Sequence, residues 1–482
     1  MATGIRRETE VSSWDDECDV LVVGLGAAGA AAAIDARAAG ADVIVLERAA
    51  AGGGTSAVSG GVIYLGGGTA LQHACGFEDS VEDMFNYLMA SLGEGPDEAR
   101  VRLYCEGSVA HFEWIKAQGV PFKETFCYGT SSEPPGDDGL VFSGSERCSP
   151  YREVAKPAPR GHVGMIPGQG GPILMKHLCA STERSGARIE TNHRVSDLVV
   201  DPDGGVVGVV ATHFGTERHL RARGGVVLTT GGFVLDDEML KRHVPRALRC
   251  QMRVAGDGDD GSGIRLGMAA GAATRNLDKA SISLLVTEPW GLKRGVLVNA
   301  RGQRCIQEDA YMGHLGEQAL FHQDGRVWLI VDDDIYEPPI LDDPIVAAGD
   351  TFEELERELG MPEGSLTSTL EVYNRHAAKG EDPLFNKLPE YLKPLDAPPY
   401  GAIDCSTDAA RYAAFTLGGL VTDLDGRVLD PEGVAIPRLY AAGRTTSGLS
   451  MGGYSSGISL GDSTFFGRRA GVAAAEAARG AA

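Results

Sequence analysis

The chain has 482 residues and a formal net charge of −23 at pH 7, and 66 of its residues are glycine. This length exceeds what one hydrophobic core usually holds, so we expect at least two domains. So acidic a surface disfavours nucleic acid and anionic lipid as partners. The first residues, MATGIRRETEVSSWDDECD, are charged, and the apolar stretch that follows is interrupted by charges, which predicts neither a secretory signal nor a membrane span.

Nine cysteines are scattered along the chain without CxxC or CxxCH spacing. This pattern argues against a zinc site, a thioredoxin-like dithiol and attached c-type haem. It is typical of reduced thiols, so we expect a cytoplasmic protein. The histidines and the acidic pair Glu308–Asp309 also lack metal-ligand spacing, and no metal is predicted.

The first elements predicted along the chain are a strand, a helix and a second strand. Asp19–Val23 is a continuous apolar run of the buried-strand type, and Val43–Leu46 is another. Between them, an alanine-rich helix starts near Ala27 and stops at Gly40, a residue type that commonly ends helices. This order indicates one βαβ unit of a parallel sheet.

The middle of the chain is less regular. Residues 125–171 are rich in glycine, proline and serine and have little periodicity, so we expect long loops that cover a site. Short strands follow between residues 187 and 233, including Val206–Val210 and Val226–Thr230, with a hairpin turn at Asp203–Gly205.

After residue 277 the composition shifts toward proline and acidic residues, with helical patterns at Phe352–Leu359 and Leu366–Ala378. The glycine-rich composition returns after residue 402, and a helix of small residues, Thr464–Ala478, ends the chain. We therefore predict a discontinuous first domain, residues 14–277 and 403–482, and an inserted domain, residues 278–402, that contacts the substrate.

The strongest local motif is the glycine-rich turn between the first strand and helix. Gly24, Gly26 and Gly29 spell GxGxxG: the first makes the tight turn, the second admits a pyrophosphate and the third lets helix pack on strand. The helix N-terminus provides free N–H groups for the phosphates. Glu47 follows the second strand, where an acidic side chain binds ribose hydroxyls. These features predict an adenine dinucleotide, either NAD or FAD.

A second GxGxxG, at Gly256–Gly261, is rejected as a nucleotide fingerprint. No apolar strand precedes it, and its three aspartates would repel a pyrophosphate.

Six segments resemble the flavoprotein superfamily of fumarate reductases and 3-ketosteroid dehydrogenases, and they occur in the order of that family. The resemblance implies FAD rather than NAD. It also implies an α/β fold in which a Rossmann-type FAD-binding domain is interrupted by an inserted α+β catalytic domain. The segments are Gly53–Gly61 (GGTSAVSGG), Thr229–Phe233 (TTGGF), Gly258–Ile264 (GDDGSGI), Val298–Glu308 (VNARGQRCIQE), Thr416–Leu420 (TLGGL) and Leu439–Gly443 (LYAAG).

The resemblance also assigns the cofactor contacts. No histidine lies between Glu47 and Gly61, where relatives with covalent flavin carry one, so FAD is expected to bind non-covalently. The last helix, whose first turn lies near Ser459–Asp462, would direct its positive end at the reduced flavin. The residues implied to bind FAD are Gly24, Gly26, Ala28, Gly29, Glu47, Arg48, Gly54, Thr55, Ser56, Ser59, Gly60, Gly61, Thr230, Gly231, Asp260, Gly443, Ser459 and Leu460.

The segment after residue 449 indicates the substrate class. Fumarate reductases of this family place a histidine and an arginine where this chain has Ser450 and Tyr454. A dicarboxylate requires a guanidinium for bidentate hydrogen bonds, whereas a tyrosine suits a neutral ketone. Tyr454-Ser-Ser-Gly457, together with Tyr311, is similar to the 3-oxo-5α-steroid 4-dehydrogenases and departs from the Tyr-Pro-Gly-Pro-Gly of the ketosteroid 1-dehydrogenases.

In the 4-dehydrogenases the matching two tyrosines and serine are the catalytic set, which implies removal of a proton from C4 of a 3-ketosteroid and of a hydride from C5. Tyr454 and a backbone N–H near Gly457 would stabilise the charge on the ketone oxygen. Ser456 would accept the proton with Tyr311 as relay. The electron acceptor is not specified by the sequence.

Three alternatives remain at this stage. The first is a ketosteroid 1-dehydrogenase and the second a fumarate-type enoate reductase. The third, from a different class, is a flavin-loaded binding or electron-transfer module without turnover.

Overall fold

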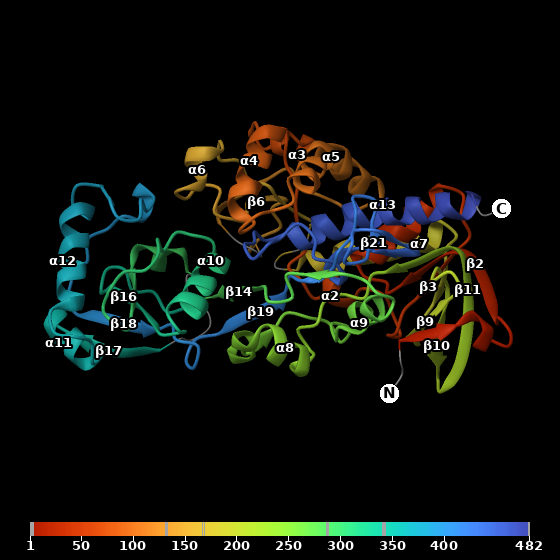
Figure 1. The fold of residues 1–482 in the computed structure, drawn as a ribbon. Coiled ribbons are helices and arrows are strands. Elements are labelled where there is room, and N and C mark those ends of the chain that lie inside the picture. The colour runs from red at the N-terminus through yellow and green to blue at the C-terminus, as the bar shows by residue number, and fades with distance from the viewer. Residues whose placement is uncertain are drawn as a thin grey trace.

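The computed structural model describes residues 4–130, 134–165, 167, 169–285, 289–339 and 344–480. Figure 1 shows a large sheet at one end of the molecule and a smaller sheet with two helices at the other. Helices α3 (Ala70–Ala74), α4 (Val81–Ser91) and α5 (Glu98–Ala117) lie on one side of the region between them.

The large sheet contains the predicted βαβ unit. Its parallel strands run in the order β8, β3, β2, β11 and β22, so the first βαβ unit lies in the middle of the array. The runs at residues 20–23 and 43–46 are buried on both faces, as the interior of a parallel sheet requires. The strands are β2 (Asp16–Val23), β3 (Val43–Leu46), β8 (Arg188–Glu190), β11 (Thr216–Leu228) and β22 (Ala435–Ala441).

An antiparallel extension completes this sheet. β9 (His193–Val200) and β10 (Val206–His213) form the predicted hairpin, and β11 pairs with β10 on one side and β2 on the other. β1 (Ile5–Arg7) pairs with β9 at the edge, and β21 (Arg427–Leu429) pairs with β22.

The first and last helices lie against each other on one face of this sheet. α1 (Ala27–Ala38) and α13 (Ile458–Gly480) meet through alanine and glycine, whose small side chains let the two backbones approach closely. α13 starts six residues before the predicted helix, so its first turn contains Ser459 and Leu460. The C-terminal segment therefore returns to the glycine-rich turn.

The prediction of long loops over residues 125–171 misses several short strands and helices, although most of the described residues of this segment lie outside them. β5 (Phe126–Thr130), β6 (Leu140–Phe142) and β7 (Gly161–Val163) join β4 (Val62–Tyr64) in a four-stranded sheet. These strands have three to five residues each, too few for their periodicity to be read against the surrounding glycines. Residues 131–133, 166 and 168 of this prediction lie outside the described residues. Two helices flank the strands: the four-residue α6 (Tyr151–Val154) and the 15-residue α7 (Gly170–Arg184).

The inserted segment forms a sheet of its own. Strands β15 (Val296–Asn299), β16 (Val327–Asp332), β18 (Tyr400–Asp404) and β17 (Ile345–Gly349) pair in that order. α11 (Phe352–Glu358) and α12 (Ser365–Ala377) match the two predicted helices within a residue at each end. The boundaries at residues 277 and 403 stay a prediction.

A three-stranded sheet connects the two parts. β14 (Ala280–Leu284) and β19 (Tyr412–Thr416) carry the chain out and back as an antiparallel pair, and β12 (Met252–Arg253) pairs with β19. α10 (Met312–Glu317) packs on β14. Two short helices, α8 (Asp237–His243) and α9 (Ser262–Ala269), and the four-residue α2 (Gly54–Ala57) complete the elements around the cavities described below.

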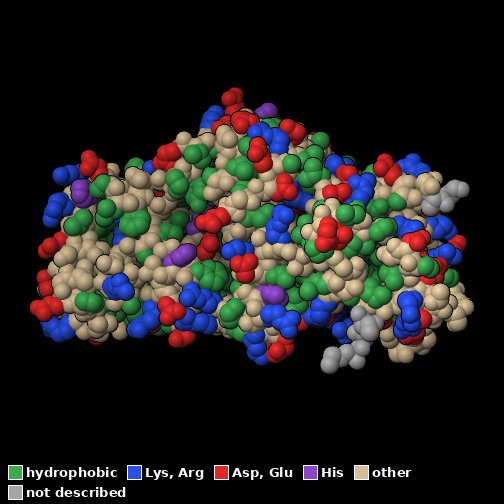
Figure 2. All heavy atoms as spheres, in the orientation of Figure 1, with side chains coloured by type: hydrophobic (Ala, Val, Ile, Leu, Met, Phe, Trp, Pro, Cys, Tyr) green, Lys and Arg blue, Asp and Glu red, His purple; other side chains and the backbone are tan. Residues whose placement is uncertain are grey.

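None of the helices described combines the length and hydropathy needed to cross a bilayer. On the face shown in Figure 2, acidic and basic side chains are interspersed, with hydrophobic side chains between them.

The close contact of α1 and α13 predicts sensitivity to a single methyl group. A Cβ at Gly471 would lie 2.1 Å from the Ala32 carbonyl oxygen. We expect Gly471→Ala to push the helices apart and lower the free energy of unfolding by about 1–3 kcal/mol, measured by chemical denaturation. Gly480→Ala, in the same helix with no atom within 4 Å of the new methyl, is the control. Equal stability of both variants would contradict the tight contact.

Candidate functional site

The glycine-rich turn forms one wall of a cavity of about 250 Å³. Gly24 has φ of +101°, a conformation that glycine adopts without strain, and a Cβ there would lie 2.7 Å from the Thr229 carbonyl oxygen. At Gly26, a Cβ would meet only the Ser56 hydroxyl at 3.7 Å and the Gly53 oxygen at 4.0 Å. The backbone is therefore accessible to a ligand at the N-terminus of α1, as pyrophosphate binding requires.

Glu47 lies at the end of β3 beside this turn. Its two carboxylate oxygens each accept a backbone N–H at 2.8 Å, one from Leu25 and one from Ala49. The side chain is 6% exposed and lines the cavity. The turn and the acid are thus held together before any ribose is bound, and the remaining lone pairs of the carboxylate face a site where hydroxyls can donate.

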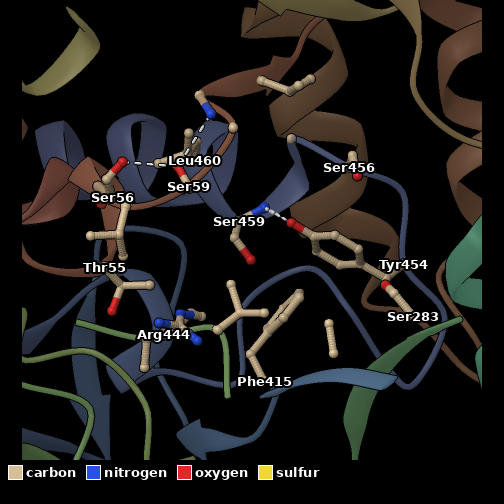
Figure 3. Close-up of a pocket in the computed structure, with 18 of the residues that line it drawn as sticks. Thr55, Ser56, Ser59, Ser283, Phe415, Arg444, Tyr454, Ser456, Ser459 and Leu460 are labelled. Carbon is tan, nitrogen blue, oxygen red and sulfur yellow. Dashed lines mark hydrogen bonds between the residues drawn. The ribbon is translucent and has the colours of Figure 1, made fainter. Parts of the chain in front are cut away.

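A larger cavity of about 680 Å³ continues from the first. The two share Thr55, Ser56, Arg444 and Ser463 in their linings, so they form one elongated site. Figure 3 shows Thr55 and Arg444 on one side of the larger cavity and Tyr454 on the other. A dinucleotide with its adenosine part in the first cavity and its reactive ring in the second would fit this shape.

Arg444 provides a further test of that fit. The guanidinium donates to the buried carboxylate of Asp259, while its Nη1 is buried without a hydrogen-bond partner among the described residues. An unpaired buried donor costs free energy unless a ligand supplies an acceptor. Because Arg444 lines both cavities, this donor fits the phosphate or ribityl oxygens of a flavin dinucleotide.

Three hydroxyl side chains meet in the larger cavity. The Tyr311 hydroxyl lies 2.7 Å from Ser456 Oγ. The Tyr454 hydroxyl accepts the backbone N–H of Ser459 at 3.1 Å, the contact drawn in Figure 3. Tyr311 precedes α10 in the inserted segment, whereas Tyr454 and Ser456 precede α13. The site is therefore assembled from parts of the chain about 145 residues apart.

Burial controls the ionisation of these groups. It raises the pKa of Tyr311, and the nearby Tyr454 adds to this effect. It also raises the pKa of Tyr454, opposed by hydrogen bonds from Ser459. Both phenols therefore stay protonated at neutral pH and are available as hydrogen-bond donors.

A search with protein families matches residues 19–460 to the family described as FAD binding domain. The chain belongs to this FAD-binding family. The match confirms the predicted cofactor and the predicted α/β, Rossmann-type fold class. It also decides between the two dinucleotides left open by the glycine-rich turn, in favour of FAD.

Two relatives are similar over nearly their whole length. The chain is 30% identical to a 3-oxo-5-alpha-steroid 4-dehydrogenase of Comamonas testosteroni, over 89% of this chain and 93% of that protein. It is 48% identical to 3-ketosteroid-delta4-(5alpha)-dehydrogenase from Rhodococcus jostii RHA1, solved in complex with 4-androstene-3,17-dione. That match has a TM-score of 0.94 and covers 98% of this chain and 99% of the other. A 3-ketosteroid delta1-dehydrogenase from Sterolibacterium denitrificans shares the fold at 22% identity and a TM-score of 0.73 over 96% and 100% of the two chains.

The structure places most of the predicted site residues on the two cavity walls. The first cavity is lined by Gly24, Gly26, Ala28, Glu47, Arg48, Gly54, Thr55, Ser56, Thr230, Gly231 and Gly443. The second is lined by Thr55, Ser56, Ser59, Gly60, Gly61, Tyr311, Tyr454, Ser456, Gly457, Ser459 and Leu460.

Two predicted residues line neither cavity. Gly29 lets helix α1 pack against the glycine-rich turn, because a Cβ at this position would lie 1.9 Å from the Gly24 oxygen. Asp260 instead forms an ion pair with Arg48 at 2.8 Å and accepts the N–H of Ser262. Its neighbour Asp259 lines the first cavity. The rejected GxGxxG at Gly256–Gly261 lies between the two-residue strand β12 and helix α9, and its residues 256–259 line the first cavity.

Arg444 and Asp259 were missed from the sequence. Arg444 directly follows the family segment Leu439–Gly443, and Asp259 lies within another. Their positions in these segments were a signal, but only the fold shows that the two side chains pair.

The pairing of Arg444 predicts its effect on the cofactor. We expect Arg444→Gln to weaken FAD binding at least about tenfold, because it removes a charged donor and leaves Asp259, 2% exposed, without its cation. Titration of the apoprotein with FAD, followed by flavin fluorescence, measures the change. Arg188→Gln removes a half-exposed arginine with two surface ion pairs and is the control. Equal FAD affinities in the two variants would contradict this assignment.

Asp462 in α13 predicts a pH dependence of stability. Burial raises its pKa to about 6, against the opposing charge of Arg100. The folded chain thus holds this proton more tightly than the unfolded chain, so stability falls as pH rises from about 4 to about 6. Asp462→Asn has no titrating group at this position. Its free energy of unfolding, relative to that of the wild type, should therefore rise by about 2–3 kcal/mol across that interval. Denaturant unfolding at several pH values tests this, and parallel profiles for the two proteins would disprove it.

Proposed function

We propose that this FAD-dependent oxidoreductase introduces the C4–C5 double bond into 3-keto-5α-steroids. The observation that carries the proposal is the hydroxyl cluster of Tyr311, Tyr454 and Ser456 in the larger cavity. Bound FAD supplies the acceptor for the hydride that leaves C5.

Tyr454 is the proposed donor to the 3-keto oxygen. Its own oxygen accepts the Ser459 N–H, so its hydrogen is free to point into the cavity. Loss of the C4 proton moves negative charge onto the ketone oxygen. A donor fixed near that oxygen in a buried site stabilises the developing charge without reorganisation.

Ser456 is the proposed acceptor of the C4 proton. Its Oγ lies 2.7 Å from the Tyr311 hydroxyl, so Ser456 can pass its own hydrogen to Tyr311 as it takes the proton from carbon. Tyr311 must release its own hydrogen in the same step, and Ser283, which lines the same cavity, is the proposed next acceptor. Serine is a weak base in water, and this shared hydrogen bond is the feature that suits it to the role.

The remaining wall of the cavity is apolar, as a steroid requires. The described lining residues include no carboxylate, and Arg253, the one arginine among them besides Arg444, is paired with Asp237 at 2.6 Å. Because the free donor of Arg444 is assigned to the cofactor, no unpaired cation among the described lining residues is left for a dicarboxylate, which disfavours the fumarate-type alternative. The apolar lining residues are Val62, Met252, Val254, Ala255, Leu285, Met312, Ala413 and Phe415.

The relatives support the same chemistry. The Rhodococcus protein is named a delta4-(5alpha)-dehydrogenase and was solved with 4-androstene-3,17-dione, a 3-ketone with the double bond at C4. The 1-dehydrogenase relative shares only the fold, so the regiochemistry is proposed from the Tyr454–Gly457 segment and the closer similarity. We further propose a cytoplasmic location, because all nine cysteines are free. The electron acceptor is left open.

The proposal is tested by adding a 3-keto-5α-steroid to the purified FAD-loaded protein without oxygen. We expect the yellow flavin absorbance to bleach and the product to carry a C4–C5 double bond. A product with a C1–C2 double bond would assign the protein to the 1-dehydrogenases instead. Unchanged absorbance with ketosteroids would favour a binding or electron-transfer module.

Tyr454→Phe tests the donor directly. We expect the bleaching rate at saturating steroid to fall about 100- to 1000-fold, because one oxyanion donor is lost while the ring is kept. Stopped-flow absorbance measures the rate. The exposed Tyr128→Phe variant is the control, since that side chain is 80% exposed. A rate within twofold of the wild type in Tyr454→Phe would refute the assigned role.

A further inference from the structure

We propose that Ser145, on the loop after β6, is a positioning residue that sets the geometry between Tyr311 and Ser456. This inference rests on the proposed function. Ser145 touches neither cavity, and neither the sequence motifs nor the similarity to the family pointed to it. Its contacts connect the two segments of the chain that supply the catalytic hydroxyls.

The Ser145 side chain holds the Tyr311 backbone. Ser145 Oγ accepts the Tyr311 N–H at 2.9 Å and lies 2.9 Å from Nδ1 of His314. Burial lowers the pKa of His314 to about 4, so the imidazole is neutral, and its Nδ1 shares a hydrogen bond with the serine hydroxyl. The first turn of α10, which begins just after Tyr311, is thereby fixed at two points.

The Ser145 backbone reaches the other segment through Tyr87 of α4. The Ser145 N–H donates to the Tyr87 hydroxyl at 2.9 Å, and this hydroxyl lies 2.8 Å from Ser455 Oγ. The Tyr87 hydroxyl thus joins the Ser145 backbone to Ser455, the neighbour of Ser456.

A third contact ties Ser456 itself to the same loop. The Ser456 N–H donates to the Ser143 carbonyl at 2.9 Å. Gly144, between Ser143 and Ser145, lies against the side chains of Tyr87 and Ser455. A Cβ at Gly144 would be 2.3 Å from the Tyr87 hydroxyl and 2.4 Å from Ser455 Oγ. Only glycine permits this approach. Ser143, Ser145 and Ser455 have no exposed surface, so water does not compete with these bonds.

These contacts constrain the pair that must exchange a hydrogen. A proton moves between Tyr311 and Ser456 only if their oxygens stay within hydrogen-bond distance, and both backbones are held by one loop of three residues. A displacement of about 1 Å between reacting groups can slow a reaction about 100-fold. Removing the Ser145 hydroxyl releases the Tyr311 backbone without substituting any residue that lines the cavity.

The test compares Ser145→Ala and Tyr87→Phe with the wild type. Anaerobic flavin bleaching is followed with 3-keto-5α-steroid, either unlabelled, deuterated at C4 or deuterated at C5. We expect both variants to bleach about 10- to 100-fold more slowly at saturating steroid, with the steroid affinity within about twofold. The isotope effect from C4 should rise, because proton removal becomes slower relative to hydride loss. Ser91→Ala, whose buried hydroxyl on α4 has no partner among the described residues, is the matched control and should retain the wild-type rate.

Two results would overturn the role of Ser145. One is a bleaching rate within twofold of the wild type in both variants. The other is a slower rate with an unchanged C4 isotope effect, which would indicate general loosening rather than misplacement of the proton acceptor. A wild type that binds FAD but is not bleached would contradict the proposed function instead. In that case a crystal structure of Ser145→Ala still decides: a Tyr311–Ser456 oxygen distance that remains at 2.7 Å refutes the inference.

Discussion

The site depends on the contact between the first and last helices of the chain. α1 begins at the glycine-rich turn, and α13 begins directly after the Tyr454–Gly457 segment. Alanines and glycines let these helices lie backbone to backbone, with a Cβ at Gly467 excluded by the Ala28 oxygen at 2.5 Å. Any bulkier interface would separate the dinucleotide cavity from the hydroxyl cluster. Close helix packing is thus what joins cofactor binding to substrate chemistry in this chain.

The inserted segment supplies the part of the site that the helix contact does not, namely Tyr311. It enters and leaves through the antiparallel pair of β14 and β19, which positions α10 and hence Tyr311 opposite the C-terminal segment. Buried ion pairs stiffen the insert near this point: Glu308 lies between Arg304 at 2.7 Å and Lys387 at 3.0 Å, and it accepts the Leu297 N–H. A charge buried in this way requires all of its partners, so it favours one arrangement of the segment that precedes Tyr311.

The sequence was sufficient for the glycine-rich turn and its strands but not for the rest of the cofactor cavity. Strand, turn, helix and Glu47 could be predicted because they are local: each spacing in the motif has a direct backbone reason. The proposed catalytic residues come from resemblance, since a tyrosine and a serine 145 positions apart have no periodicity in common. Ser145 and Arg444 could not be found this way. Their roles come from contacts between distant segments, and strands as short as β6 and β7 leave no readable pattern around them.

The two ends of the site differ in the charge that they stabilise. Burial keeps both tyrosines protonated, so neither favours a negative charge, and the proposed Tyr311–Ser456 pair would have to pass hydrogens on. The Ser459 N–H and the N-terminus of α13 lie at the Tyr454 end, where partial positive charge favours an anion. A ketone oxygen beside Tyr454 would therefore develop its charge where the chain stabilises it. The carbon that loses the proton would face Tyr311 and Ser456, which can accept a hydrogen but not hold a negative charge. A neutral serine suits this position because a carboxylate there would have to lose its hydration.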